Sequence, residues 1–99
     1  MKKFDVFKIG AGLYLAVQAE HLLDLNTVVL VPVLPADVFP GLSRLTIDVQ
    51  IGGTPYRIRC HMPLTVEAKR LRQLKPVHRL SQHEGQKVMD GLNTILWGL

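Results

Sequence analysis

Few residues in this chain are of the types that carry catalysis or bind metal. There are four histidines, His21, His61, His78 and His83, and one cysteine, Cys60. None of the histidines stands at a metal-ligand spacing from another histidine or from the cysteine, so we expect no metal. The eight carboxylates are scattered, and neither a glycine-rich phosphate loop nor a nucleophile elbow is present. The sequence therefore predicts no catalytic residue and no cofactor.

One strand-like segment carries Arg57, Arg59 and His61 on the same face. This cluster has two interpretations, a grip on phosphate or an ordinary solvated face. The basic run over residues 69–79 has the same ambiguity, with an acidic partner segment as its ligand. Cys60 falls on the opposite, apolar face, which favours a buried, inert thiol over a nucleophile.

The C-terminal residues Trp97, Gly98 and Leu99 indicate binding instead. Trp97 is the only tryptophan and follows a helix-like segment. A chain end frays unless something holds it, whereas tryptophan is a preferred anchor of binding hot spots. The indole is therefore either presented to a partner or folded back onto the protein's own core.

Composition bounds the setting in which such binding would occur. A chain of 99 residues predicts one domain over residues 1–99. It is 47% hydrophobic and 20% charged, and the apolar surface left over favours a homodimer. The net charge of +4 suits an acidic partner or approach to DNA-bound machinery. The chain has a single cysteine and no signal-like segment, and its longest apolar run, over 28–34, is too short to span a bilayer. These features predict a cytoplasmic protein without membrane contact.

Alternating and β-branched segments predict the strands that would hold these residues. They cover residues 3–9, 13–19, 27–31, 45–51 and 56–62. Phe7 is expected on the face opposite Val6, and Met62 on the inward face of the last strand. Three prolines predict that residues 33–42 are mostly loop.

The C-terminal third changes character. Residues 64–80 predict a helical turn over 66–71 and a strand near 76–80. Ser81 and Glu84 match a capping box, and a helix is expected over 82–96, with Gly85 and Gly91 allowing backbones to approach closely. The predicted fold class is mainly β with one C-terminal helix, built from about five to seven short antiparallel strands that close into a small barrel or a strongly bent sheet.

Four short motifs occur in an order typical of one family. They are Val17-Gln18 with Leu22-Leu23-Asp24, the hairpin over 47–57, Leu80-Ser81 with Glu84, and the ending Ile95-Leu96-Trp97-Gly98-Leu99. With these motifs the chain resembles the CcdB toxins of type II toxin–antitoxin systems. It departs from them in a one-residue insertion at His21 and in a proline-rich 33–42 loop.

The resemblance implies an SH3-like β-barrel of the CcdB/MazF toxin type, working as a homodimer. It implies a DNA gyrase poison and not an enzyme: the dimer binds the gyrase A subunit and traps gyrase with cleaved DNA. An indole facing an arginine there would contribute about 2 kcal/mol when desolvated. The implied gyrase-binding residues are Trp97, Gly98 and Leu99, with Leu96, Asn93, Leu22 and Leu23 as weaker candidates. For Leu22, Leu23 and Leu96, packing in the core or at the dimer interface is the alternative.

The resemblance also implies partners. A CcdA-like antitoxin would fold its acidic, disordered segment onto the toxin, and their complex would repress its own operon, so that DNA is contacted only through antitoxin or gyrase. Two alternatives stay open. One is a MazF-like endoribonuclease toxin, for which Arg57, Arg59 and His61 are the fallback site because the first turn is short. The other is a non-toxic, antitoxin-binding regulatory homologue.

Overall fold

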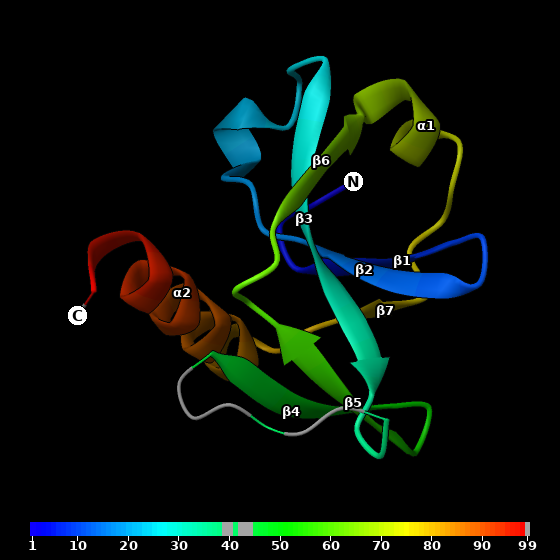
Figure 1. Ribbon diagram of the computed structural model, residues 1–99. Coiled ribbons are helices and arrows are strands. Elements are labelled where there is room, and N and C mark those ends of the chain that lie inside the picture. Colours follow the sequence, from blue (N-terminus) through cyan, green and yellow to red (C-terminus); the bar gives the residue numbers. More distant parts are fainter. Residues whose placement is uncertain (39–40, 42–44, 99) are drawn as a thin grey trace.

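The computed structural model describes residues 1–38, 41 and 45–98. Within them the chain forms seven strands, one 3₁₀ helix and two α-helices (Figure 1). In chain order these are β1 (Asp5–Ile9), β2 (Gly12–Ala16), η1 (Glu20–Leu22), β3 (Thr27–Pro35), β4 (Thr46–Ile51), β5 (Thr54–Arg59), β6 (Leu64–Glu67), α1 (Ala68–Arg72), β7 (His78–Arg79) and α2 (Gln82–Trp97).

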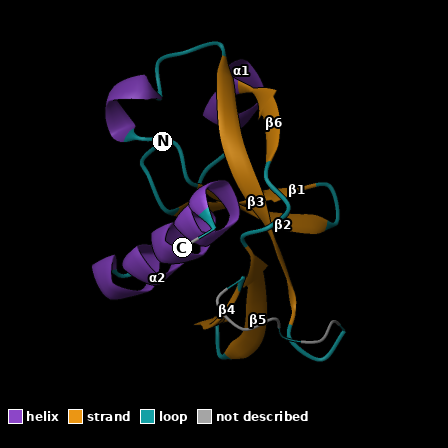
Figure 2. Cartoon of the chain, turned by 60° about the vertical axis from the view of Figure 1, so that its left-hand side comes forward, coloured by secondary structure: helices purple, strands orange, loops and turns teal. Residues whose placement is uncertain are grey.

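The strands form one antiparallel sheet in the order β4-β5-β3-β2-β1-β7, with β6 paired to β3 off this path. The long strand β3 organises the sheet. One of its edges pairs with β2, and the other pairs first with β6 and then with β5. The sheet curls so that α2 crosses in front of it (Figure 2). This curled, half-barrel sheet with a C-terminal helix confirms the predicted fold class.

Side chains from the two faces of the sheet enter two hydrophobic clusters. The first lies between the sheet and α2 and includes Val6, Leu15, Ile58 and Val88. The second includes Phe7, Leu30 and Leu71 beneath α1. Consecutive strand residues point to opposite faces, and Val6 and Phe7 follow this rule as the sequence predicted. Hydrophobic burial on both faces explains why β3 reads as a continuous apolar run.

The strand β3 is longer than the sequence predicted. Residues 33–35 continue the strand that was expected to end at Val31, and they pair with β5. Proline in a strand normally removes a ladder hydrogen bond. Pro32 does not, because its nitrogen faces the edge that β6 and β5 share and lies at the junction between these two partners. Most of the predicted loop beyond residue 38 lies outside the described residues.

Further boundaries differ from the predictions. The strand expected over 3–9 begins only at Asp5, and the strand expected over 13–19 ends at Ala16. The strand β5 ends at Arg59, so Met62 is 47% exposed rather than inward-facing. Residues 64–67 form the unpredicted strand β6, and the helical turn expected over 66–71 begins only at Ala68. The strand near 76–80 is confirmed but shortened to His78–Arg79.

The helix α2 forms where it was predicted and runs one residue further, to Trp97. The capping box is confirmed: the Glu84 amide donates to Ser81 Oγ at 3.1 Å and the Ser81 amide donates to Glu84 Oε1 at 2.9 Å. The close approach of backbones predicted at Gly85 takes another form, because the group that packs against this glycine is the side-chain ring of Phe4. None of the described helices is long and apolar enough to cross a membrane.

Candidate functional site

The last turn of α2 presents apolar side chains to solvent. Val88 and Leu92 are buried, but Ile95 is 39% exposed, Leu96 70% and Trp97 73%. The helix therefore runs past the core that holds its first turns, and its C-terminal end lies away from the sheet (Figure 1). The interpretation in which Trp97 folds back to cap the core is wrong.

This last turn is held by a defined C-cap. Gly98 adopts the left-handed conformation, with φ of 70°, and its amide donates to the Thr94 carbonyl at 2.8 Å. Glycine reaches this conformation without a Cβ penalty. The cap fixes the backbone that carries Trp97, so the exposed indole projects from an ordered helix end. Asn93 is also exposed, whereas Leu99 lies outside the described residues.

The two weaker candidates on η1 have different environments. Leu22 is 40% exposed, whereas Leu23 is 8% exposed and belongs to the second cluster. Leu23 thus has the packing role that the sequence left open. Leu22 belongs to η1 and Trp97 to α2, and these two elements lie on the left of Figure 1. No hydrogen bond between these two elements is found in the described part of the chain.

A glutamine that the sequence analysis did not single out as a site residue holds η1 in place. Gln18 Nε2 donates to the carbonyls of Leu22, at 2.5 Å, and Thr27, at 3.2 Å. Its Oε1 accepts from the Val29 amide at 3.1 Å. One side chain therefore joins the end of β2 to η1 and β3. The signal was present in the Val17-Gln18 motif, but spacing alone does not reveal these contacts.

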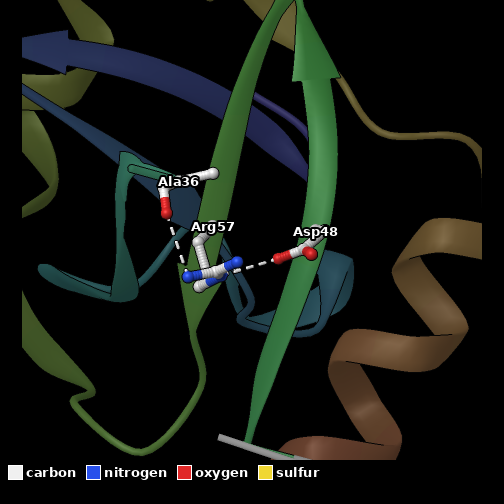
Figure 3. A network of polar contacts seen from close by, with 3 residues as sticks. All are labelled: Ala36, Asp48 and Arg57. Carbon is white, nitrogen blue, oxygen red and sulfur yellow. Dashed lines mark hydrogen bonds and ion pairs between the residues drawn. The ribbon is translucent and has the colours of Figure 1, made fainter. Parts of the chain in front are cut away.

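The basic strand face does not form one concerted site. Figure 3 shows the Arg57 guanidinium between Asp48 and Ala36: Nε donates to Asp48 Oδ1 at 2.8 Å, and Nη1 donates to the Ala36 carbonyl at 3.0 Å. The hydrogen bond with Asp48 raises the pKa of Arg57. Arg57 thus ties β4 and the end of β3 to β5. Arg59 Nη2 instead lies 3.2 Å from His61 Nε2.

Cys60 is fully buried, and burial raises its pKa to about 11. Because the thiolate is the reactive form, this thiol is inert at neutral pH, as the sequence predicted. Among the residues that the structure describes, no group of three or more His, Cys, Asp or Glu side chains could hold a metal ion.

Comparisons place this geometry among known proteins. A family model described as CcdB protein matches residues 3–98. No curated protein matches the sequence. A solved endoribonuclease from a mycobacterial species is 16% identical with a TM-score of 0.79, covering 100% of this chain and 92% of that one.

Two other solved structures share the fold. The Mycobacterium tuberculosis toxin MazF-mt6 is 14% identical with a TM-score of 0.73, and 96% of each chain is covered. The MazE-MazF complex from Deinococcus radiodurans is 11% identical with a TM-score of 0.74, covering 97% of this chain and 95% of that one. At these identities the likeness shows the fold alone.

Proposed function

Because the chain belongs to the CcdB protein family, we propose that it is the toxin of a type II toxin–antitoxin module and poisons DNA gyrase by binding its A subunit. One observation supports this most directly. The capped last turn of α2 presents Trp97, 73% exposed, beside Leu96, 70% exposed. Exposed large apolar side chains on a rigid element are typical of a partner-binding surface.

The chemistry of the contact follows from the indole. Its face attracts a guanidinium, by about 2 kcal/mol once both are desolvated. A homodimer would present two copies of the last turn about one two-fold axis, which matches a two-fold gyrase A dimer without further sequence. Trp97, Gly98 and Leu99 are the proposed main contacts, and Leu96, Asn93 and Leu22 the proposed flanking ones. Leu23 would act by packing η1.

Binding, rather than catalysis, is the proposed mode of action. The buried Cys60 thiol and the engaged Arg57 guanidinium offer no nucleophile or free phosphate grip. The toxin would act in the cytoplasm and be neutralised by a CcdA-like antitoxin through an acidic segment. The pair together would repress their operon.

A DNA cleavage assay with purified gyrase tests the proposal. We expect the wild-type protein to accumulate linear, gyrase-linked DNA and the Trp97→Ala variant to lose this activity by at least about tenfold, since a hot-spot truncation costs 2 kcal/mol or more. Val38→Ala, which trims another exposed apolar side chain (58% exposed), is the matched control. Equal trapping by wild type and Trp97→Ala would refute the proposal.

Sequence-specific RNA cleavage is the second candidate function. The fold shared with an endoribonuclease and the contact between Arg59 and His61 at 3.2 Å favour it, because a cationic side chain beside an imidazole suits phosphodiester chemistry. Incubating the protein with RNA in the absence of gyrase separates the two. Cleavage that disappears in an Arg59→Ala variant would establish this function in place of the first.

A further inference from the structure

The strand β6 has an open edge. It pairs with the N-terminal part of β3, from Thr27 to Leu30, and with no other strand of the described chain. Unpaired strand edges present rows of amides and carbonyls that can pair with another chain. The short length of β6, four residues, limits this edge to a small docking surface.

The pairing register shows which backbone groups this edge presents. The Ala68 amide donates to the Asn26 carbonyl at 2.7 Å, directly beyond the β3–β6 ladder. Hydrogen-bonded and non-hydrogen-bonded pairs alternate along an antiparallel ladder. Val66 and Leu64 therefore bond to β3, while the amides of Thr65 and Glu67 and the carbonyl of Thr65 point away from it. The Glu67 carbonyl belongs to the N-cap of α1 and accepts the first bond of that helix.

A cation-lined groove runs beside this edge. Its volume is about 440 Å³, and its lining comes from β6 and α1: Thr65, Val66, Glu67, Lys69, Arg70 and Gln73. A smaller adjoining groove of about 260 Å³ adds Arg72 and again includes Glu67 and Lys69. We name these two hollows and the outer edge of β6 the β6–α1 groove.

The charge of the β6–α1 groove is predominantly positive. Lys69, Arg70 and Arg72 are all exposed, and Glu67 is the one carboxylate among the lining residues of the two hollows. The Lys69 amine lies 3.7 Å from that carboxylate, with both side chains at least 70% exposed. An exposed pair at this distance is weak, so Lys69 remains available to another anion.

We propose that the β6–α1 groove docks an extended acidic peptide, which adds to β6 as a further strand and places its carboxylates against the α1 cations. Backbone pairing with both polar groups of Thr65 and with the Glu67 amide would supply the strand-addition contacts, and the cations would select an acidic sequence. The positive charge that α1 places beside this edge also discourages self-association, which disfavours a second copy of this chain as the occupant.

The acidic silencing segment of the proposed function is the natural occupant, and only this identification of the partner rests on that proposal. The surface is separate from the last turn of α2 that would meet gyrase. An antitoxin segment bound here would leave Trp97 uncovered. To silence the toxin, another part of the antitoxin would have to cover Trp97, or the arrangement of the dimer would have to bring the bound segment near it. The docking chemistry can be tested without gyrase.

Titration with a fluorescent synthetic peptide of alternating Glu and Val residues tests the groove in the full chain. We expect saturable binding that weakens with salt, and about tenfold or greater loss in a Lys69→Glu/Arg70→Glu double variant. Lys87→Glu reverses an exposed charge on α2 and is the matched control. Equal affinity for a Lys–Val peptide, or unchanged binding by the double variant, would overturn the proposal.

Amide hydrogen exchange followed by NMR distinguishes strand addition from loose ionic attraction. The Thr65 and Glu67 amides should become protected when the Glu–Val peptide binds, while the Val66 amide is protected already. Binding without protection of these two amides would show that no strand is added. Protection in the free protein that rises with concentration would identify a second copy as the occupant and equally contradict the proposal.

Discussion

Single side chains in this protein act mainly as connectors. Gln18 uses both ends of its amide to connect η1 to β3, and Arg57 uses two nitrogens to reinforce the β4–β5 pairing and to bind the Ala36 carbonyl beyond the end of β3. Leaving a buried backbone group without its partner costs more than one hydrogen bond gains. We therefore expect the largest effects of polar substitution at such connectors and not at the scattered surface charges.

Replacing Gln18 by alanine tests this view. The part-buried Val29 amide would lose its partner, whereas the exposed carbonyls of Leu22 and Thr27 would bind water instead. We therefore expect a loss of about 0.5–1.5 kcal/mol in the free energy of unfolding, measured by urea denaturation. Gln50→Ala, at an exposed position on β4, should change it by less than about 0.5 kcal/mol. Equal effects of the two substitutions would show that the Gln18 bridge adds no stability.

The buried thiol predicts a pH dependence. Burial raises the pKa of Cys60 from 9.0 to about 11, so the folded state holds a proton that the unfolded state releases at lower pH. The stabilisation is complete below pH 9.0 and is lost as pH rises towards about 11, amounting to roughly 3 kcal/mol at most. The free energy of unfolding of the wild type should therefore fall towards that of the Cys60→Ala variant as pH rises through this range. Parallel pH profiles would refute the assignment.

At the scale of elements, contacts before the first turn of α2 fix where this helix begins, and its last turn extends beyond the core. Arg79 Nε donates to Asp5 Oδ1 at 2.8 Å, and the Lys2 amide donates to Asp5 Oδ2 at 2.9 Å. Asp5 is 1% exposed, so this pair fastens β7 to β1 directly before the capping box at Ser81. The start of α2 is thereby fixed, while the far end projects towards solvent.

Gly85 sets how closely α2 approaches the sheet. A Cβ at this position would lie 2.6 Å and 2.8 Å from Cδ2 and Cζ of Phe4. The Phe4 backbone amide donates a hydrogen bond to the Ala16 carbonyl at 2.8 Å, and Phe4 has a positive φ of 71°. Alanine normally stabilises a helix by about 1 kcal/mol over glycine. Here we expect Gly85→Ala to lower the melting temperature.

The matched control is Gln86→Ala, one position along on the exposed side of α2, which should leave the melting temperature within a few degrees. A Phe4→Leu change should relieve part of the Gly85→Ala penalty, because the smaller side chain makes room for the Cβ. A stabilised Gly85→Ala protein would contradict the packing described here.

At the scale of the whole molecule, β3 joins the two hydrophobic clusters. Leu30 lies in the second cluster and Val31 in the first, on opposite faces of one strand. If β3 detached from one cluster, its residues in the other cluster would be exposed to solvent as well. We therefore expect the chain to unfold as one cooperative unit.

Leu30→Ala tests this cooperativity. Loss of a fully buried leucine should lower the free energy of unfolding by about 2–5 kcal/mol, and urea unfolding should remain a single transition. Native-state hydrogen exchange should become faster to the same extent for amides around Phe7 and around Ile58, one from each cluster. Faster exchange confined to the second cluster would show that it unfolds on its own.

The sequence by itself determined the features that depend on local pattern. The alternation of β4 and β5, the capping box at Ser81 and the helical spacing of α2 all act between neighbouring residues, so they could be predicted. The exposed Trp97 was visible as a candidate because its type and position need no partner to be noticed. Cys60 could be assigned to the core because it follows the alternation of its strand.

Only the tertiary structure decided what depends on distant segments. Pro32 is tolerated within β3 because β6 and β5 meet at its open side, which no local signal encodes. Leu22 and Leu23 are adjacent and alike in sequence, yet one is exposed and the other packs in the second cluster. Trp97 lies in solvent because packing against the sheet stops at Leu92, and where burial ends along a helix is set by the size of the surface it crosses.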